Sequence, residues 1–228
     1  MDKNETNLWI VIPAYNEGEV LRNVVSGVAA SYKNIIVVDD CSTDNTGAAA
    51  CAGGAIVLRH PINLGQGAAL ETGIRYALSC GAKTIVTFDA DGQHQVEDIS
   101  VLARRQVETG ADIVIGSRFL GQATGISWLR RIVLRLAVVF TRITSGVSLT
   151  DAHNGFRLLT RHAAEKIRIS QNRMAHASEI IDKIGVLGLS VAEAPVTIIY
   201  TEYSLRKGQK LSNAINILSE LLIARLNK

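Results

Sequence analysis

Short apolar runs alternate with segments of helical periodicity through the first half of the chain. Apolar residues that recur every three or four positions predict helices at residues 17–31, 45–53, 68–80 and 96–109. Continuous apolar runs between them predict buried strands at residues 8–13, 34–40, 55–58, 83–88 and 112–116. This alternation predicts the α/β class, with a mostly parallel, Rossmann-like sheet flanked by helices.

The pattern changes after residue 120. Residues 128–143 are apolar except for an edge of arginines (Arg130, Arg131, Arg135 and Arg142), which suits either a core helix with a solvated edge or a helix on a membrane surface. The remaining expected elements are a strand at 156–160, a helix at 174–187, a strand at 191–200, a basic loop at 203–210 and a helix at 211–226. Because no repeat or low-complexity linker interrupts the chain, we predict one domain, 1–228, with halves 8–118 and 119–228.

Polar clusters follow four of the predicted strands. Ligands of such sheets bind outside the carboxyl ends of the strands, so these clusters predict a binding site on one rim. The clusters are Tyr15-Asn16-Glu17, Asp39-Asp40, Asp89-Ala90-Asp91 and Ser117-Arg118.

Asp89 and Asp91 are the most informative pair on this rim. Residues i and i+2 of an extended segment point to the same side, so both carboxylates are aimed at one place. Two close carboxylates repel each other unless a cation lies between them, and hard oxygen ligands suit Mg²⁺ or Mn²⁺. Gln93 offers a further oxygen ligand. An isolated Asp-x-Asp is more often a solvated turn, but the neighbouring clusters favour a metal and diphosphate site.

Composition narrows the function classes. A net charge of +3 over 228 residues argues against a dedicated nucleic-acid binder. Cys41, Cys51 and Cys80 have no Cys-x-x-Cys spacing, which predicts free thiols in a reducing compartment. The polar N-terminus lacks a signal-peptide core, and no apolar run reaches the ~20 residues of a membrane span. These features predict a cytoplasmic protein.

The order of the motifs resembles the family-2 glycosyltransferases of the GT-A fold. The chain is most similar to the branch of dolichyl-phosphate mannose synthases and bacterial polyprenyl-phosphate glycosyltransferases. The similarity runs from residue 8 to about residue 210. The matching motifs lie at residues 12–17, 38–44, 63–67, 89–94, 116–118 and 150–157.

This resemblance implies roles for individual residues. The nucleotide base and ribose would be lined by Pro13, Tyr15, Glu17, Asp39, Asp40 and Gln66. The metal and the diphosphate would be held by Asp89, Ala90, Asp91 and Gln93. Arg118 would lie near a phosphate of the donor or acceptor, and Asp151 on the acceptor side. The basic loop with Arg206 and Lys210 would close over the donor, although its Gly208-Gln209-Lys210 departs from the Gly-x-Ser-Lys of many relatives.

The reaction implied by the resemblance is inverting, Mg²⁺- or Mn²⁺-dependent sugar transfer. The donor would be a UDP- or GDP-linked sugar, bound by half 8–118, and the acceptor a polyprenyl phosphate reached by half 119–228. Many relatives continue into transmembrane helices, so a chain ending at Lys228 is expected to be peripheral on the cytoplasmic face of a membrane, with a separate membrane subunit as an open option.

Other interpretations remain open at this point. A saccharide hydroxyl acceptor would require a general base, for which Asp151 is the candidate. A non-catalytic sugar-nucleotide-binding subunit is the alternative from another class. His94 and His153 are expected to be solvated loop residues. A dehydrogenase is disfavoured because the run 65–70 lacks the third glycine of Gly-x-Gly-x-x-Gly.

Overall fold

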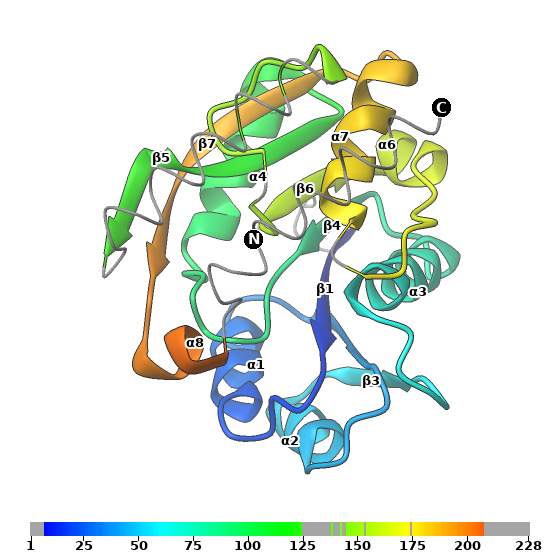
Figure 1. Ribbon diagram of the computed structural model, residues 1–228, viewed down its shortest axis with the longest axis vertical. Helices are drawn as coiled ribbons and strands as arrows, with labels where there is room; N and C mark the ends of the chain where they lie inside the picture. Colours follow the sequence, from blue (N-terminus) through cyan, green and yellow to red (C-terminus); the bar gives the residue numbers. More distant parts are fainter. Residues whose placement is uncertain are drawn as a thin grey trace.

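The computed structural model describes residues 7–124, 138, 142, 145–152, 154–173 and 175–207, without the side chains of Ala123, Leu205 and Arg206. Within these residues one sheet has the strand order β3-β2-β1-β4-β6-β5-β7 (Figure 1). Strand β6 is antiparallel to β4 and β5, and all other neighbours are parallel, which confirms the mostly parallel sheet. The strands are β1 (Leu8–Ala14), β2 (Asn34–Asp39), β3 (Ile56–Arg59), β4 (Thr84–Thr87), β5 (Ile113–Thr124), β6 (Arg157–Thr160) and β7 (Val191–Ile199).

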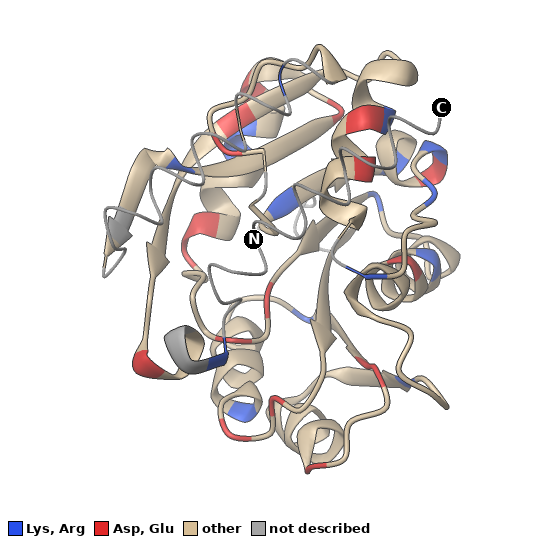
Figure 2. Ribbon diagram, viewed as in Figure 1, with Lys and Arg blue, Asp and Glu red and all other residues tan. Residues whose placement is uncertain are grey.

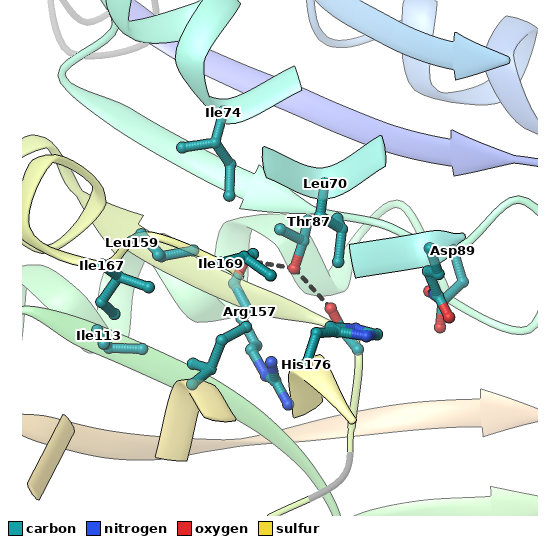
Figure 3. Close-up of a pocket in the computed structure, with 13 residues that line it drawn as sticks. Leu70, Ile74, Thr87, Asp89, Ile113, Arg157, Leu159, Ile167, Ile169 and His176 are labelled. Atoms are coloured by element: carbon teal, nitrogen blue, oxygen red, sulfur yellow. Dashed lines mark hydrogen bonds between the residues drawn. The ribbon is translucent and has the colours of Figure 1, made fainter. Parts of the chain in front are cut away.

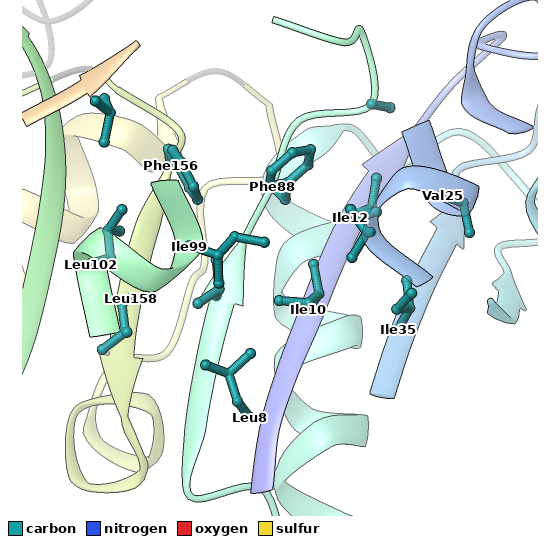
Figure 4. Close-up of a cluster of buried hydrophobic side chains, with 14 of the residues drawn as sticks. Leu8, Ile10, Ile12, Val25, Ile35, Phe88, Ile99, Leu102, Phe156 and Leu158 are labelled. Atoms are coloured by element: carbon teal, nitrogen blue, oxygen red, sulfur yellow. The ribbon is translucent and has the colours of Figure 1, made fainter. Parts of the chain in front are cut away.

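Helices cover both faces of this sheet, as Figure 1 shows. One apolar cluster joins the sheet to α1 (Leu21–Ala29), α2 (Thr46–Gly53) and α4 (Asp98–Thr109); Figure 4 shows part of it. A second cluster joins the opposite face to α3 (Gln66–Ser79), α6 (Arg161–Lys166) and α7 (His176–Val186). All seven residues of β1 are buried because a central strand is covered on both faces, which explains its continuous apolar run.

The pairing between β1 and β4 stops near the carboxyl end of β1, at the rim of the sheet. Pairing of β1 with β4 ends at Val11 and Thr87, two residues before Pro13, which has no N–H for a further ladder bond. Strand β4 separates from β1 there and leads into Asp89 and Asp91. The predicted binding rim therefore starts where the ladder between the two central strands stops.

The structure changes some of the predicted elements. Strand β5 continues to Thr124, with a register shift between Ser117 and Gln122, where a five-residue strand was expected. The expected basic loop begins instead as helix α8 (Glu202–Lys207), and helix α6 was not predicted. The predicted helices at 128–143 and 211–226 lie outside the described residues, apart from Val138 and Arg142, as do His153 and Lys210.

Two expectations about the whole chain stand as follows. The three cysteines are free thiols, as predicted. No helix in the described part of the chain has the length and apolar character needed to cross a bilayer. The division into halves 8–118 and 119–228 stays a prediction, although β6 and β7 of the second half complete the sheet of the first.

Candidate active site

The loops after β1 and β2 are bound to each other at the rim. The amide of Asn16 donates to Ser42 Oγ at 2.9 Å, and the amide of Glu17 donates to Thr46 Oγ1 at 2.7 Å. Asn16 Oδ1 in turn accepts from the amide of Thr43 at 2.8 Å. Asn16 has a φ of 54°, a left-handed conformation that asparagine tolerates better than most residues. These bonds hold the Tyr15–Glu17 segment in place beside β2.

The two carboxylates after β4 have different environments. The Asp89 carboxylate accepts a 2.9 Å hydrogen bond from His94 Nε2, and Asp91 accepts from the amide and the Nε2 of Gln93, at 3.0 and 2.6 Å. Burial and the charge of Asp89 raise the pKa of Asp91 from 3.8 to about 6. Burial opposes ionisation of Asp89 too, but His94, with help from His176 and Arg157, lowers the pKa of that carboxyl.

The raised pKa of Asp91 predicts a pH-dependent gain in stability for Asp91→Asn in metal-free protein. Because the folded chain disfavours ionised Asp91, the penalty is absent below the unfolded pKa of 3.8 and grows as the pH rises through about 6. The full shift would be worth at most about 3 kcal/mol, and solvent contact reduces this to about 1–2 kcal/mol. Thermal unfolding in EDTA should show the full gain at pH 8 and little gain at about pH 3.5, below the unfolded pKa; a gain independent of pH would contradict this.

The donor set after β4 fits a hard divalent cation. Both side chains present carboxylate oxygens, and their mutual repulsion, seen in the pKa of Asp91, is what a cation would relieve. Among the described residues, no group of three or more His, Cys, Asp and Glu side chains converges on a metal position. A cation held by Asp89 and Asp91 would therefore take its remaining ligands from Gln93, water or a bound diphosphate, as Mg²⁺ commonly does.

Gln66 lies near Asp89, at the start of α3. Its Nε2 is 3.4 Å from Asp89 Oδ1, so the amide faces that carboxylate. The predicted contact of Gln66 with the nucleotide base stays a prediction. The N-terminus of α3 is itself covered, because the amides of Gly67 and Ala68 donate to the carbonyl oxygen of Asn172.

A pocket beside Asp89 brings a buried cation close to the rim (Figure 3). Aliphatic side chains from α3, β5, β6, α7 and the segment between α6 and α7 line it. Its polar groups come from Gln66, Thr87, Asp89, Arg157 and His176. Arg157 is 2% exposed and donates to the carbonyl oxygen of Ala152 at 3.3 Å. Burial lowers the pKa of Arg157 to about 10, while Asp89 and Asp151 oppose that fall, so the guanidinium stays charged at pH 7.

The two adjacent acids that end β2 make separate contacts. Asp39 is fully buried; its Oδ1 accepts from the amide of Ser42 at 2.9 Å, and its Oδ2 lies 3.6 Å from Arg59 Nη1. Asp40 accepts from the amides of Leu64 and Gly65 at 2.9 and 2.6 Å and contacts His60 Nδ1 at 2.7 Å. Asp40 therefore anchors the loop between β3 and α3, and its predicted role toward a nucleotide stays a prediction, as does that of Asp39.

Helix α8 packs over the first rim cluster. The Tyr203 hydroxyl donates to Glu17 Oε2 at 2.6 Å, and Lys207 Nζ lies 3.0 Å from Glu17 Oε1. Burial and the contact with Glu17 raise the pKa of Tyr203, so its phenol remains a donor. Lys207 also donates to the carbonyl oxygens of Tyr15 and Asn16. Figure 2 shows acidic segments on loops around α1 and α8. Lys207 brings a positive charge to this region through its contact with Glu17.

The other residues predicted for the rim differ in their exposure to solvent. Pro13 and Ala90 are buried, whereas Tyr15 is 45% exposed. The backbone of Arg206 lies in α8, and Lys210 lies outside the described residues. The contact of Lys207 with Glu17 shows that the basic segment does reach the rim, through a residue that the sequence did not single out.

Arg118 and Asp151 form a buried ion pair. Arg118 donates from its backbone amide and from Nε to Asp151 Oδ2, at 3.1 and 2.6 Å, and from Nη1 to the Tyr200 hydroxyl at 2.6 Å. The side chains are 11% and 1% exposed. Burial disfavours the charge on Arg118, but Asp151 outweighs it and raises the pKa of the guanidinium. Glu193 of β7 holds the backbone around Asp151 in place by accepting hydrogen bonds from the amides of Thr150 and Asp151.

Sequence reasoning missed several residues of this site. His94, expected to be solvated, is 7% exposed and bonded to Asp89. Arg157 and His94 both lie inside motifs that the sequence singled out, so their neighbourhood was signalled but their contacts were not. Glu193, Tyr200 and Tyr203 carry no local signal, because their partners lie far away in the chain.

Comparison with protein families gives one match that covers most of the chain. The model for "Glycosyl transferase family 2" matches residues 9–168. These residues take in the strands from β1 to β6 (Figure 1), and the matched range includes Asp89 and Asp91.

Similar curated proteins extend over the whole chain. An uncharacterized protein of Methanocaldococcus jannaschii is 36% identical, with 98% of this chain and 94% of that protein covered. A UDP-N-acetylglucosamine–dolichyl-phosphate N-acetylglucosaminyltransferase of Methanococcus voltae is 31% identical, with 97% of each covered. A polyprenol monophosphomannose synthase of Mycolicibacterium smegmatis is 34% identical, with 87% of this chain and 79% of that protein covered.

The fold agrees with these matches. Glucosyl-3-phosphoglycerate synthase of Mycobacterium tuberculosis, crystallised with Mn²⁺ and UDP-glucose, superposes with a TM-score of 0.74 over 96% of this chain and 78% of that one, at 18% identity. This similarity confirms the GT-A architecture expected from the motifs. With the family match and the relatives that span its length, the chain belongs to glycosyltransferase family 2 and is a transferase.

Proposed function

We propose that this chain transfers a sugar from a nucleoside-diphosphate sugar to a polyprenyl phosphate, with inversion at the anomeric carbon and with Mg²⁺ or Mn²⁺ bound. The observation that carries the proposal is the carboxylate pair Asp89 and Asp91 at the carboxyl end of β4, next to the bound loops of β1 and β2. The cation would be held by Asp89 and Asp91, with the amide of Gln93 beside them.

The donor would bind at the part of the rim formed by the carboxyl ends of β1, β2 and β4. The nucleoside would lie against Tyr15, Glu17 and Asp39, and its diphosphate would extend toward Asp89 and Asp91. A bound divalent cation would act as a Lewis acid that neutralises charge on the departing diphosphate. Lys207 contacts Glu17, so α8 would cover a donor bound beside Glu17 and exclude water from it.

The Arg118–Asp151 pair favours an anionic acceptor. Asp151 is 1% exposed and paired with Arg118, an environment that does not suit a base that must take a proton from a hydroxyl. A lipid phosphate is ionised at pH 7 and needs no base, and Arg118 would attract it. The Methanococcus and Mycolicibacterium relatives are named for different sugars and share a polyprenyl-type lipid phosphate, which supports this acceptor class.

The place of action would be the cytoplasmic surface of a membrane, because the acceptor is a membrane lipid and the donor is water-soluble. The arginine edge predicted for residues 128–143 is the candidate contact with anionic lipids. The names of these relatives give no support for a separate membrane subunit, and the proposed function requires none.

The first test is a thermal-shift titration with UDP and GDP, each with and without Mn²⁺. A ligand that binds only the native state stabilises it by mass action and so raises the melting temperature. At a concentration of 100 times its Kd, the gain in the free energy of unfolding is about 2.7 kcal/mol. We expect a metal-dependent rise with one nucleotide, which would also identify the donor class. No rise with either nucleotide would contradict the proposed donor site.

The second test concerns the acceptor. Purified chain and Mn²⁺ are incubated with a panel of sugars linked to the identified nucleotide, and with a short-chain polyprenyl phosphate or a free oligosaccharide as acceptor. The products are separated by charge and hydrophobicity. We expect the product to be the polyprenyl phosphate with the sugar joined to its phosphate group. Transfer to the oligosaccharide alone would instead support the saccharide-hydroxyl acceptor.

A further inference from the structure

His94 is bonded directly to one of the two carboxylates of the proposed cation site. Its Nε2 lies 2.9 Å from Asp89 Oδ2. A carboxylate only accepts, so His94 donates from Nε2, and in the neutral ring Nδ1 is the bare nitrogen. Nδ1 is buried and has no hydrogen-bond partner in the described part of the chain. The ring therefore has one directed contact, and that contact is Asp89.

The ring of His94 packs against two phenylalanine rings, which also contact each other. Its centroid lies 5.4 Å from that of Phe88, edge to face, and 4.7 Å from that of Phe156. The backbone at this position is held as well, because Gln93 accepts at its carbonyl oxygen from the amide of Ile199, beside a bridge between His94 and Ile198. The imidazole is thus held by packing and has little freedom to choose another partner.

The contact with His94 makes the two carboxylate oxygens of Asp89 unlike each other. Oδ2 accepts from His94, and among the described residues Oδ1 has only the 3.4 Å contact from Gln66. A third side of the carboxylate is closed by Gly155, where an added Cβ would lie 2.8 and 2.9 Å from the two oxygens. With rotation restricted in this way, Oδ1 is the oxygen left for a cation.

We propose that His94 is a positioning residue that orients the Asp89 carboxylate so that Oδ1 binds the divalent cation. The inference rests on the proposed function, because it presumes that a cation binds at Asp89 and Asp91. Partners that orient a metal ligand in this way commonly affect metal affinity by about 10- to 100-fold.

A matched pair of substitutions separates orientation from packing. His94→Gln keeps an N–H donor near the position of Nε2, whereas His94→Met has nearly the same length and volume but no donor. Methionine is compatible with an aromatic environment, so both variants are expected to fold. His162→Met, on the exposed surface of α6, controls for an added methionine.

Mn²⁺ affinity is measured by calorimetry with each variant saturated by the nucleotide that the wild type binds, and melting temperatures are recorded without metal. We expect His94→Met to weaken Mn²⁺ binding by about tenfold or more, and His94→Gln to stay within about threefold of the wild type. Equal losses in both variants would indicate packing alone and overturn the inference, as would wild-type affinity in His94→Met. A wild type that binds no Mn²⁺ with either nucleotide would refute the metal-dependent function itself.

Discussion

Asp89→Asn is expected to reduce sugar transfer by about 10³-fold or more while the chain remains folded. The substitution keeps the shape of the side chain and an acceptor for His94, but it removes the charge that would hold the cation. Loss of metal stabilisation worth about 4 kcal/mol in the transition state corresponds to that reduction in rate. Turnover is measured with saturating donor and Mn²⁺, and Asp182→Asn on the exposed face of α7 serves as the matched control.

Wild-type turnover in Asp89→Asn would refute the role of this carboxylate. A second measurement separates lost turnover from misfolding, because the two rim carboxylates are expected to have opposite effects on the stability of the metal-free protein. The pKa of Asp89 is lowered, so its ionised form stabilises the fold above the unfolded pKa of 3.8, and this stability is lost as the pH falls through the lower folded value. In EDTA at pH 8, Asp89→Asn should therefore melt lower than the wild type and Asp91→Asn higher.

This opposition follows from the different surroundings of the two carboxylates that follow β4. Asp89 lies near His94, His176 and Arg157, which favour its negative charge. Asp91 meets mainly burial and the charge of Asp89. The protein's own groups thus favour the ionised form of Asp89 and disfavour that of Asp91, so the two carboxylates are electrostatically unlike.

The sequence predicted the parts of the fold that local patterns encode. The apolar run 8–13 and the helical spacing of 96–109 correspond to β1 and α4 because burial repeats with the period of each element. The rim clusters at Glu17, Asp40 and Asp89 follow from the polarity of parallel strands, which places their carboxyl ends on one edge.

Other features depend on contacts between distant segments. The position of β6 between β4 and β5 could not be inferred, because strand pairing is set by packing across the chain. His94 was expected to be solvated because a histidine after an Asp-x-Asp turn gives no local sign of the Phe156 ring against which it packs. Helix α8 was expected to be a loop because its stabilising contacts are with Glu17, about 186 residues away.

The second large effect is expected at the buried pair of Arg118 and Asp151. Removal of one partner leaves the other charge without compensation in a site that is nearly closed to water, which commonly costs about 3–5 kcal/mol. We therefore expect Arg118→Met and Asp151→Leu each to lower the free energy of unfolding by about that amount, measured by urea denaturation at pH 7.

The double variant Arg118→Met/Asp151→Leu separates stability from function. With both charges gone, its free energy of unfolding should exceed the value expected from adding the two single losses by about 2 kcal/mol or more. Its transferase activity should nevertheless remain as low as that of Arg118→Met, because the proposed acceptor phosphate has lost its cation. Strictly additive losses would contradict the coupling seen in the structure, and recovered activity would show that Arg118 serves the fold but not the acceptor.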